Sequence, residues 1–188
     1  YVGGTVNNHG FYPLQTGDSI QDILIDGGPS PQAIGLELGS KIPFWDRTIA
    51  LVVLTHPHSD HLAGLVEVLH RYRVEQMFFP DLASESDIYR EWIRLIEEKG
   101  IEYTVARAGQ QIDLGDGVMI NVLNQPTPLL LDTESDVDNN GLILRLIMGK
   151  IDFLLTADIM REAELELVSD RTDLHSIVLK VAHHGSDT

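Results

Sequence analysis

Histidine and aspartate side chains crowd into one short segment of the sequence, directly after the apolar run IALVVL. The segment THPHSDH holds four residues of the types that bind metal ions, namely His56, His58, Asp60 and His61. Residues two apart in an extended chain point to the same side, so His56 and His58 can meet at one ion. Asp60 and His61 follow at the expected start of a helix, where they can serve a second ion nearby. The spacing therefore predicts a site for two metal ions.

A simpler interpretation is a polar turn without metal. In that case Asp60 is the N-terminal cap of the following helix, and the histidines face solvent. Four ligand-type side chains at this spacing, directly after a buried strand, favour the metal site.

Composition restricts the chemistry further. The 188 residues contain no cysteine, so histidine and carboxylate are the strong metal ligands that remain. The 13 basic and 29 acidic residues give a formal net charge of −16, which opposes broad binding to nucleic acid phosphates. Apolar residues make up 43% of the chain, and no apolar run reaches the ~20 residues that a membrane helix needs. These properties are typical of a globular domain.

Short runs of Val, Ile and Leu alternate with amphipathic stretches, which predicts an α/β fold in a single domain, residues 1–188. We expect strands at Ile23–Asp26, Ile49–Thr55, Val74–Phe79, Ile101–Val105, Val118–Leu123, Leu142–Met148, Ile151–Thr156 and Ser176–Ala182. Gly149-Lys150 is expected to form a tight turn between two of these strands.

Three helices are expected, at Leu62–Tyr72, at Ser86–Lys99 and after Asp158. The second has a capping box made by Ser84 and Asp87, and it ends at Gly100. In GDSIQDILIDGG, residues 17–28, we expect two strands joined at Gln21-Asp22. These two residues suit a tight hairpin poorly, so residues are expected to be missing there.

Four motifs in order, spread from residue 23 to residue 186, carry a resemblance to the metallo-β-lactamase fold superfamily. They are ILIDGG (23–28), HPHSDH (56–61), FLLTAD (153–158) and LKVAHHGS (179–186). The resemblance implies a four-layer αββα sandwich with a binuclear site at one edge. Relatives continue past the last motif, so we expect the fold to be incomplete at the C-terminus of this sequence.

The resemblance also implies roles for single residues. Asp26 would support the ligand turn from behind, with Gly27 and Gly28 allowing a close backbone turn. Asp158 would bridge both ions, because one carboxylate has two oxygens. One site would then consist of Asp60, His61, Asp158 and either His183 or His184.

Neighbouring residues of an extended chain point opposite ways, so the sequence does not choose between the two histidines. We favour His184 as the ligand and place His183 toward the substrate, where it could act as an acid. Asp60 could also orient the nucleophile.

The other site lacks an expected ligand. No histidine lies between His70 and His175, where many relatives supply a third ligand for the first ion. Either one of Asp138, Asn139 and Asn140 replaces it, or His56, His58, Asp158 and water hold that ion alone. We expect two divalent ions, Zn²⁺ or Mn²⁺, with the first site weak or empty.

Within the superfamily, the chain most resembles the C-terminal soluble domain of the ComEC competence proteins. The segments TESDVDNNGLILRL (133–146) and LKVAHHGS (179–186) carry this resemblance, and PFWDRTIALVVLTHPHSDH (43–61) fits it as well. It implies a nuclease that degrades DNA during uptake, with single-stranded DNA as substrate and the membrane channel domain of the same parent chain as partner. The location implied is the extracytoplasmic side of a bacterial plasma membrane.

Two alternatives remain open. One is a hydrolase of the same fold that acts on a small phosphoester or a lactone. The other is a catalytically weak domain that binds DNA or a protein partner.

Overall fold

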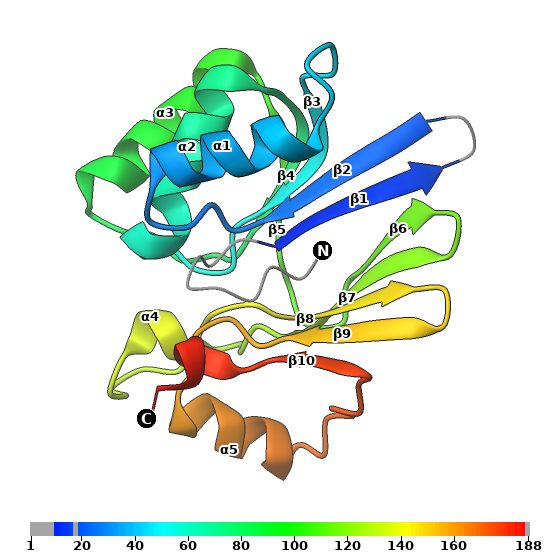
Figure 1. Cartoon of the computed structure of the whole chain (residues 1–188). Helices are drawn as coiled ribbons and strands as arrows, with labels where there is room; N and C mark the ends of the chain where they lie inside the picture. The colour runs from blue at the N-terminus through cyan, green and yellow to red at the C-terminus, as the bar shows by residue number, and fades with distance from the viewer. Residues whose placement is uncertain (1–9, 17–18, 187–188) are drawn as a thin grey trace. The chain divides into compact units, whose positions relative to one another are not determined.

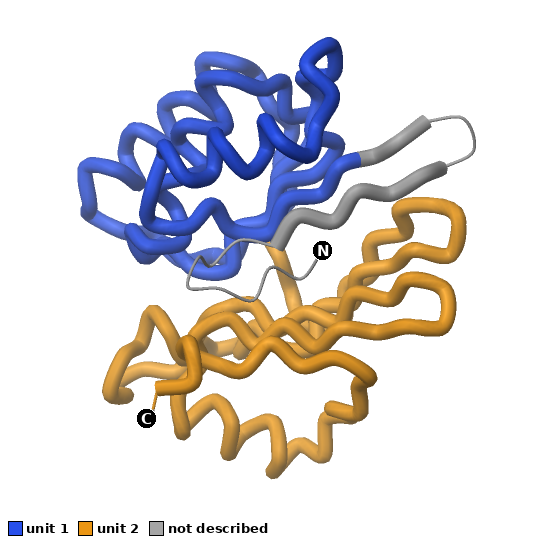
Figure 2. The backbone as a smooth tube through the Cα atoms, viewed as in Figure 1, with its two compact units in different colours: residues 1–105 blue, residues 106–188 orange. Residues whose placement is uncertain are grey.

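The computed structural model describes residues 10–16 and 19–186. These residues form two compact units, residues 1–105 and residues 106–188 (Figure 2). The single-domain organisation stays a prediction. In the part of the chain that the structure describes, no helix has the length and apolar character needed to cross a membrane.

The first unit contains a five-stranded sheet in the order β1-β2-β3-β4-β5 (Figure 1). Its strands are β1 (Gly10–Thr16), β2 (Ser19–Ile25), β3 (Thr48–Val53), β4 (Arg73–Phe79) and β5 (Glu102–Val105). β1 and β2 are antiparallel, whereas β2 to β5 are parallel to their neighbours. Parallel neighbours need crossover connections. These connections contain α1 (Pro31–Lys41), α2 (Ser59–Arg71) and α3 (Asp87–Lys99).

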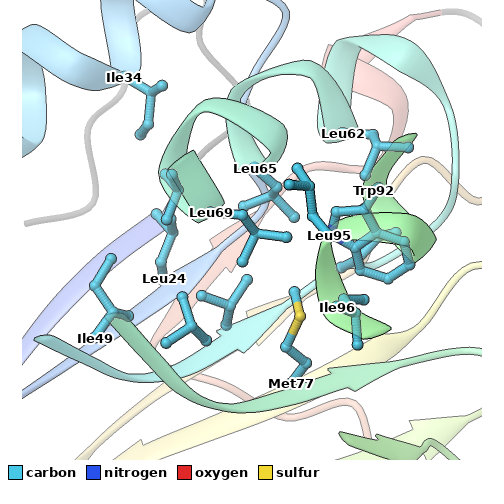
Figure 3. Packing of buried hydrophobic residues seen from close by; sticks show 14 of the residues in the cluster. Leu24, Ile34, Ile49, Leu62, Leu65, Leu69, Met77, Trp92, Leu95 and Ile96 are labelled. Carbon is cyan, nitrogen blue, oxygen red and sulfur yellow. The ribbon is translucent and has the colours of Figure 1, made fainter. Parts of the chain in front are cut away.

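Apolar side chains of these three helices pack against one face of this sheet (Figure 3). Leu24 of β2 and Met77 of β4 belong to the same buried cluster as Ile34, Leu65 and Trp92 from the three helices. Burial of such side chains stabilises a fold by roughly 1.5–3 kcal/mol each. This core holds the carboxyl end of β3 and the start of α2 in place, and the ligand turn connects them.

The second unit contains a five-stranded sheet in the order β10-β9-β8-β7-β6. Its strands are β6 (Gln111–Gly115), β7 (Val118–Asn124), β8 (Ile143–Met148), β9 (Ile151–Leu155) and β10 (Val178–Lys180). β10 runs parallel to β9, and the other pairs are antiparallel. The remaining elements are α4 (Asp136–Asn139), α5 (Arg161–Ser169) and the 3₁₀ helix η1 (Ala182–Gly185). Ala163 and Leu167 of α5 pack on Ile143 and Leu154 of the sheet.

The predicted α/β class is confirmed, as is the turn at Gly149-Lys150 between β8 and β9. The hairpin predicted at Gln21-Asp22 is wrong, because both residues lie inside β2, where Asp22 pairs with Pro13. β2 runs without a break through these residues, and the turn that joins β1 to β2 lies outside the described residues.

Helix boundaries also differ from the prediction. The N-cap of α3 is Ser86, whose side chain accepts a hydrogen bond from the Tyr89 amide, and not Ser84. Gly100 ends this helix in the left-handed region, as expected. α1 was not predicted, although Ser30 caps it and Pro31 opens it. β1, β6 and the single-turn α4 were not predicted either.

Candidate metal centre

The ligand turn connects β3 to α2 within the first unit. The N-cap of α2 is His58, in extended conformation and without a side-chain capping bond, and Asp60 lies in the first helical turn. Asp60 is therefore not the helix cap that the simpler interpretation required. The ring centroid of His56 lies 4.9 Å from that of His58 and 4.0 Å from that of His61. The structure thus gathers the three histidine rings of the turn.

The distances between candidate ligand atoms suit shared ions. One ligand atom each of His56 and His58 lie within 4.8 Å of one another. His61 Nε2 lies 3.7 Å from Asp60 Oδ2. Ligands that bind one ion at ~2.0–2.2 Å lie at separations of this size. The pairs of ligands predicted from the sequence are therefore brought together within the first unit.

Asp26 lies behind the ligand turn and is buried. Its Oδ1 accepts a hydrogen bond from the Thr55 amide at 2.8 Å, and its Oδ2 accepts one from Thr55 Oγ1 at 2.8 Å. Oδ2 also lies 2.8 Å from His61 Nδ1. The contact to a ligand histidine is the one that the supporting role of Asp26 requires.

This arrangement determines which nitrogen of each histidine can bind a metal. An ionised carboxylate only accepts hydrogen bonds, so His61 must donate from Nδ1, and its Nε2 is the ligand atom. Thr55 Oγ1 donates its one proton to Asp26 and must accept from His56 Nδ1, 3.1 Å away. Nε2 is therefore the ligand atom of His56 as well. Asp26 sets one tautomer directly and the other through Thr55.

Two glycines let the loop after β2 meet α2. Gly27 donates its amide to the His61 carbonyl at 2.7 Å, and Gly64 donates its amide to the Gly28 carbonyl at 2.9 Å. A Cβ atom on Gly64 would collide with the backbone of Gly27, and a Cβ on Gly27 would collide with the backbone of Gly64 and Leu65. Gly28 has a φ of 72°. The GG pair and Gly64 are therefore required for this close backbone contact.

In the second unit, Asp158 and His184 lie together. His184 Nε2 is 2.8 Å from Asp158 Oδ2. Of the two adjacent histidines, His184 is thus the one in contact with the carboxylate. His183 Nδ1 is buried without a hydrogen-bond partner in the described structure. Ala157, His183 and His184 all adopt positive φ, at 48°, 43° and 56°. Such backbone conformations in non-glycine residues cluster at functional sites.

The three residues considered as a replacement ligand differ in what their side chains do. Asn139 Oδ1 accepts hydrogen bonds from the amides of Met160 and Ala163, so it caps α5. Asn140 bonds to both backbone groups of Leu130. Asp138 is buried beside them and offers a carboxylate oxygen as a ligand atom. Among the three, Asp138 is the candidate ligand that the structure favours.

Two residues of this centre escaped the sequence analysis. Thr55 directly precedes His56, and its position at the end of the strand was the only signal. Lys180 lies within LKVAHHGS, and its Nζ is 3.6 Å from Asp158 Oδ1. The donor set of both units consists of imidazole nitrogens and carboxylate oxygens, which fits Zn²⁺ or Mn²⁺.

Comparison with known proteins gives a family match and two curated relatives. Residues 21–137, more than half of the chain, match the metallo-beta-lactamase superfamily. ComE operon protein 3 of Bacillus subtilis (strain 168) is 25% identical over 155 residues, which cover 79% of this chain and 19% of that protein. Ribonuclease Z of Methanopyrus kandleri is 32% identical over 100 residues, which cover 50% of this chain and 32% of that protein. This chain therefore corresponds to less than a third of either relative.

Solved structures agree on the fold. The solved structure of a B3 metallo-beta-lactamase with an active-site glutamic acid aligns with a TM-score of 0.57 at 16% identity. The alignment covers 92% of this chain and 71% of that chain. At this identity, the likeness concerns the fold alone.

Proposed function

Because the chain belongs to the metallo-beta-lactamase superfamily, we propose that it is a metal-dependent hydrolase that cleaves phosphodiester bonds in single-stranded DNA. One observation carries the hydrolase assignment: Asp26 and Thr55 together present Nε2 of both His56 and His61 as ligand atoms. A polar turn without metal has no need of two fixed tautomers. A metal site needs both tautomers to be fixed, because each ligand nitrogen must be unprotonated and face the ion.

In this proposal His56, His58 and Asp138 would hold the first ion and Asp60, His61 and His184 would hold the second, and Asp158 would serve as a ligand of both. The superfamily supports this division, and so does the pairing of ligands within each unit. When bound, divalent ions at these residues would lower the pKa of a water molecule toward neutrality and would offset charge on the phosphoryl oxygens. Zn²⁺ and Mn²⁺ both suit this set, in which imidazoles and carboxylates are mixed.

The chain's own residues supply orientation and proton transfer. Asp60 lies in the first turn of α2, where the core fixes its backbone, and it would orient the attacking water. We place His183 toward the substrate, where it would donate a proton to the leaving oxygen; the resemblance of LKVAHHGS supports this role.

The DNA substrate is inferred from the relatives. The match to ComE operon protein 3 agrees with the ComEC resemblance, and the other curated relative is by name a ribonuclease. We therefore propose that the chain acts in competence-linked DNA uptake, as a domain of a bacterial plasma-membrane protein on its extracytoplasmic side. Its partner would be the channel domain of the same parent chain.

The test is hydrolysis of a single-stranded DNA oligonucleotide with added Mn²⁺ or Zn²⁺. The double variant His61→Ala, Asp158→Ala should lose activity, because it removes ligands from both units. The double variant His70→Ala, Asp170→Ala replaces an exposed residue of the same type in each unit and should keep activity. Equal activity of the wild type and the His61→Ala, Asp158→Ala variant would contradict the proposal.

A small-molecule hydrolase is the second candidate, and the net charge of −16 favours it, because the charge repels a polyanion. A panel of chromogenic phosphoesters and lactones, run beside the oligonucleotide, separates the two functions. Turnover of the panel without cleavage of the oligonucleotide would support the small-molecule function. Metal binding without any turnover would identify a binding domain.

A further inference from the structure

Lys180, the last residue of β10, contacts the turn that follows β9. Its Nζ donates a hydrogen bond to the Ala157 carbonyl at 3.1 Å and lies 3.6 Å from Asp158 Oδ1. The Lys180 carbonyl accepts a hydrogen bond from Thr156 Oγ1 at 2.6 Å. All of these contacts lie within the second unit, so one lysine touches three consecutive residues of this turn.

The turn has a backbone conformation that needs support. Ala157 has a φ of 48°, in the left-handed region that disfavours a residue with a Cβ atom. Its carbonyl oxygen receives two donors, the Lys180 ammonium and the His183 amide, the latter at 3.3 Å. Lys180 thus connects the strained residue to the segment that carries His184.

The charge of Lys180 faces the same carboxylate that His184 contacts. Asp158 is buried, with its Oδ1 toward Lys180 and its Oδ2 toward His184 Nε2. At 3.6 Å, the lysine and Oδ1 are too far apart for a strong hydrogen bond. The Lys180 ammonium donates its hydrogen bond to the Ala157 carbonyl. Its positive charge offsets the negative charge of the buried Asp158 carboxylate. Both interactions favour one orientation of Asp158.

We propose that Lys180 is a positioning residue that holds the Ala157–Asp158 turn in the conformation in which Asp158 binds metal. This inference rests on the proposed function, in which Asp158 is the bridging ligand. Lys180 itself is not a ligand, and it acts through the backbone carbonyl and the charge of its neighbour.

The first measurement is calorimetric titration of the metal-free protein with Mn²⁺ alone. Lys180→Met keeps most of the length of the side chain but removes the donor and the charge. It should weaken Mn²⁺ binding about tenfold or more, as loss of a residue that supports a ligand typically does. Lys150→Met makes the same change at an exposed hairpin position of the same unit and should bind as the wild type does. Lys180→Arg keeps a cationic donor and should recover part of the affinity.

The second measurement needs no metal. Hydrogen exchange of the His183 amide reports directly on its bond to the Ala157 carbonyl, and exchange should be faster in Lys180→Met than in Lys150→Met. Circular dichroism of each variant shows whether the fold is intact.

The two measurements separate this inference from the proposed metal centre. If the wild type binds no Mn²⁺, the metal centre is wrong, and the exchange rate still decides whether Lys180 holds the turn. Unchanged exchange at His183 in Lys180→Met would overturn the inference. Tighter Mn²⁺ binding by Lys180→Met would overturn it as well, because the lysine would then compete with the ion for Asp158.

Discussion

The buried carboxylate of Asp26 lies 2.8 Å from Nδ1 of His61, thirty-five residues further along the chain. This contact joins the loop after β2 to the start of α2. It directs Nε2 of His61 away from Asp26 and toward Asp60 Oδ2. Asp26 is thus hydrogen-bonded to one candidate ligand, His61, whose other ring nitrogen lies near the second, Asp60.

Replacing Asp26 with Asn should weaken metal binding strongly. The amide NH₂ would face groups that already donate, namely Thr55 and His61, so the tautomer of His61 would no longer be fixed. We expect a loss of roughly 10- to 100-fold in affinity for Mn²⁺ or Zn²⁺. Asp87→Asn, at an exposed position of α3, is the matched control, and calorimetry is the measurement. Equal affinities of the two variants would show that Asp26 does not support the ligand.

Asp138 should be the replacement ligand for the first ion. Asp138→Asn removes the charge of the candidate ligand, whereas Glu134→Gln removes a charge at an exposed position of the same segment. We expect Asp138→Asn to lose the more weakly bound ion and Glu134→Gln to keep it. The measurement is native mass spectrometry after saturation with metal. If Asp138→Asn loses no ion, Asp138 is not the replacement ligand. His56 and His58 would then have no third protein ligand from this segment.

Gly64→Ala should destabilise the first unit. The new Cβ would collide with the backbone of Gly27, and neither backbone can move without breaking the hydrogen bonds of the loop. We expect a loss of about 3 kcal/mol in the free energy of unfolding. Gly39→Ala, in α1, meets nothing within 4 Å and should stabilise by roughly 0.5–1 kcal/mol. Urea denaturation compares the two, and a neutral Gly64→Ala would show that the loop can relax.

The contribution of Asp22 to the free energy of unfolding should decrease as pH rises from 4 to 7. Burial, and secondly the nearby Asp46 carboxylate, raise the pKa of Asp22 from 3.8 to about 6. The folded state therefore holds this proton more tightly than the unfolded state does, and its stabilisation is lost as pH rises through about 6.

Asp22→Asn removes the free-energy cost of ionising this carboxyl group in the folded state. It should raise the free energy of unfolding at pH 7.5 by about 1–3 kcal/mol, since each pKa unit corresponds to ~1.4 kcal/mol. At pH 4 the variant and the wild type should be nearly equal. Thermal unfolding across this pH range is the measurement, and a constant difference at all pH values would contradict the shifted pKa.

The sequence predicted those features whose signals are local. The ligand turn was recognised because its four side chains are close in the chain, and β3 was recognised from a continuous apolar run. α1 had local signals in Ser30 and Pro31, but only Ile34 and Leu38 of this helix are buried, so its apolar period was too weak to detect.

Contacts between distant segments could not be predicted from the sequence. The approach of Gly27 to Gly64 depends on how α2 packs against the sheet. The internal hydrogen bonds of Asn139 and Asn140 depend on α5 and on the loop near Leu130. The role of Thr55 required the positions of Asp26 and His56 together.

The central claim is that the chain binds two divalent ions through ligands from both units. The most direct test is the metal content per chain, measured by inductively coupled plasma mass spectrometry after saturation with Zn²⁺ or Mn²⁺ and removal of the unbound ions. We predict close to two ions per chain for the wild type and fewer than one for His61→Ala, Asp158→Ala. About one ion per wild-type chain, or fewer, would contradict the claim.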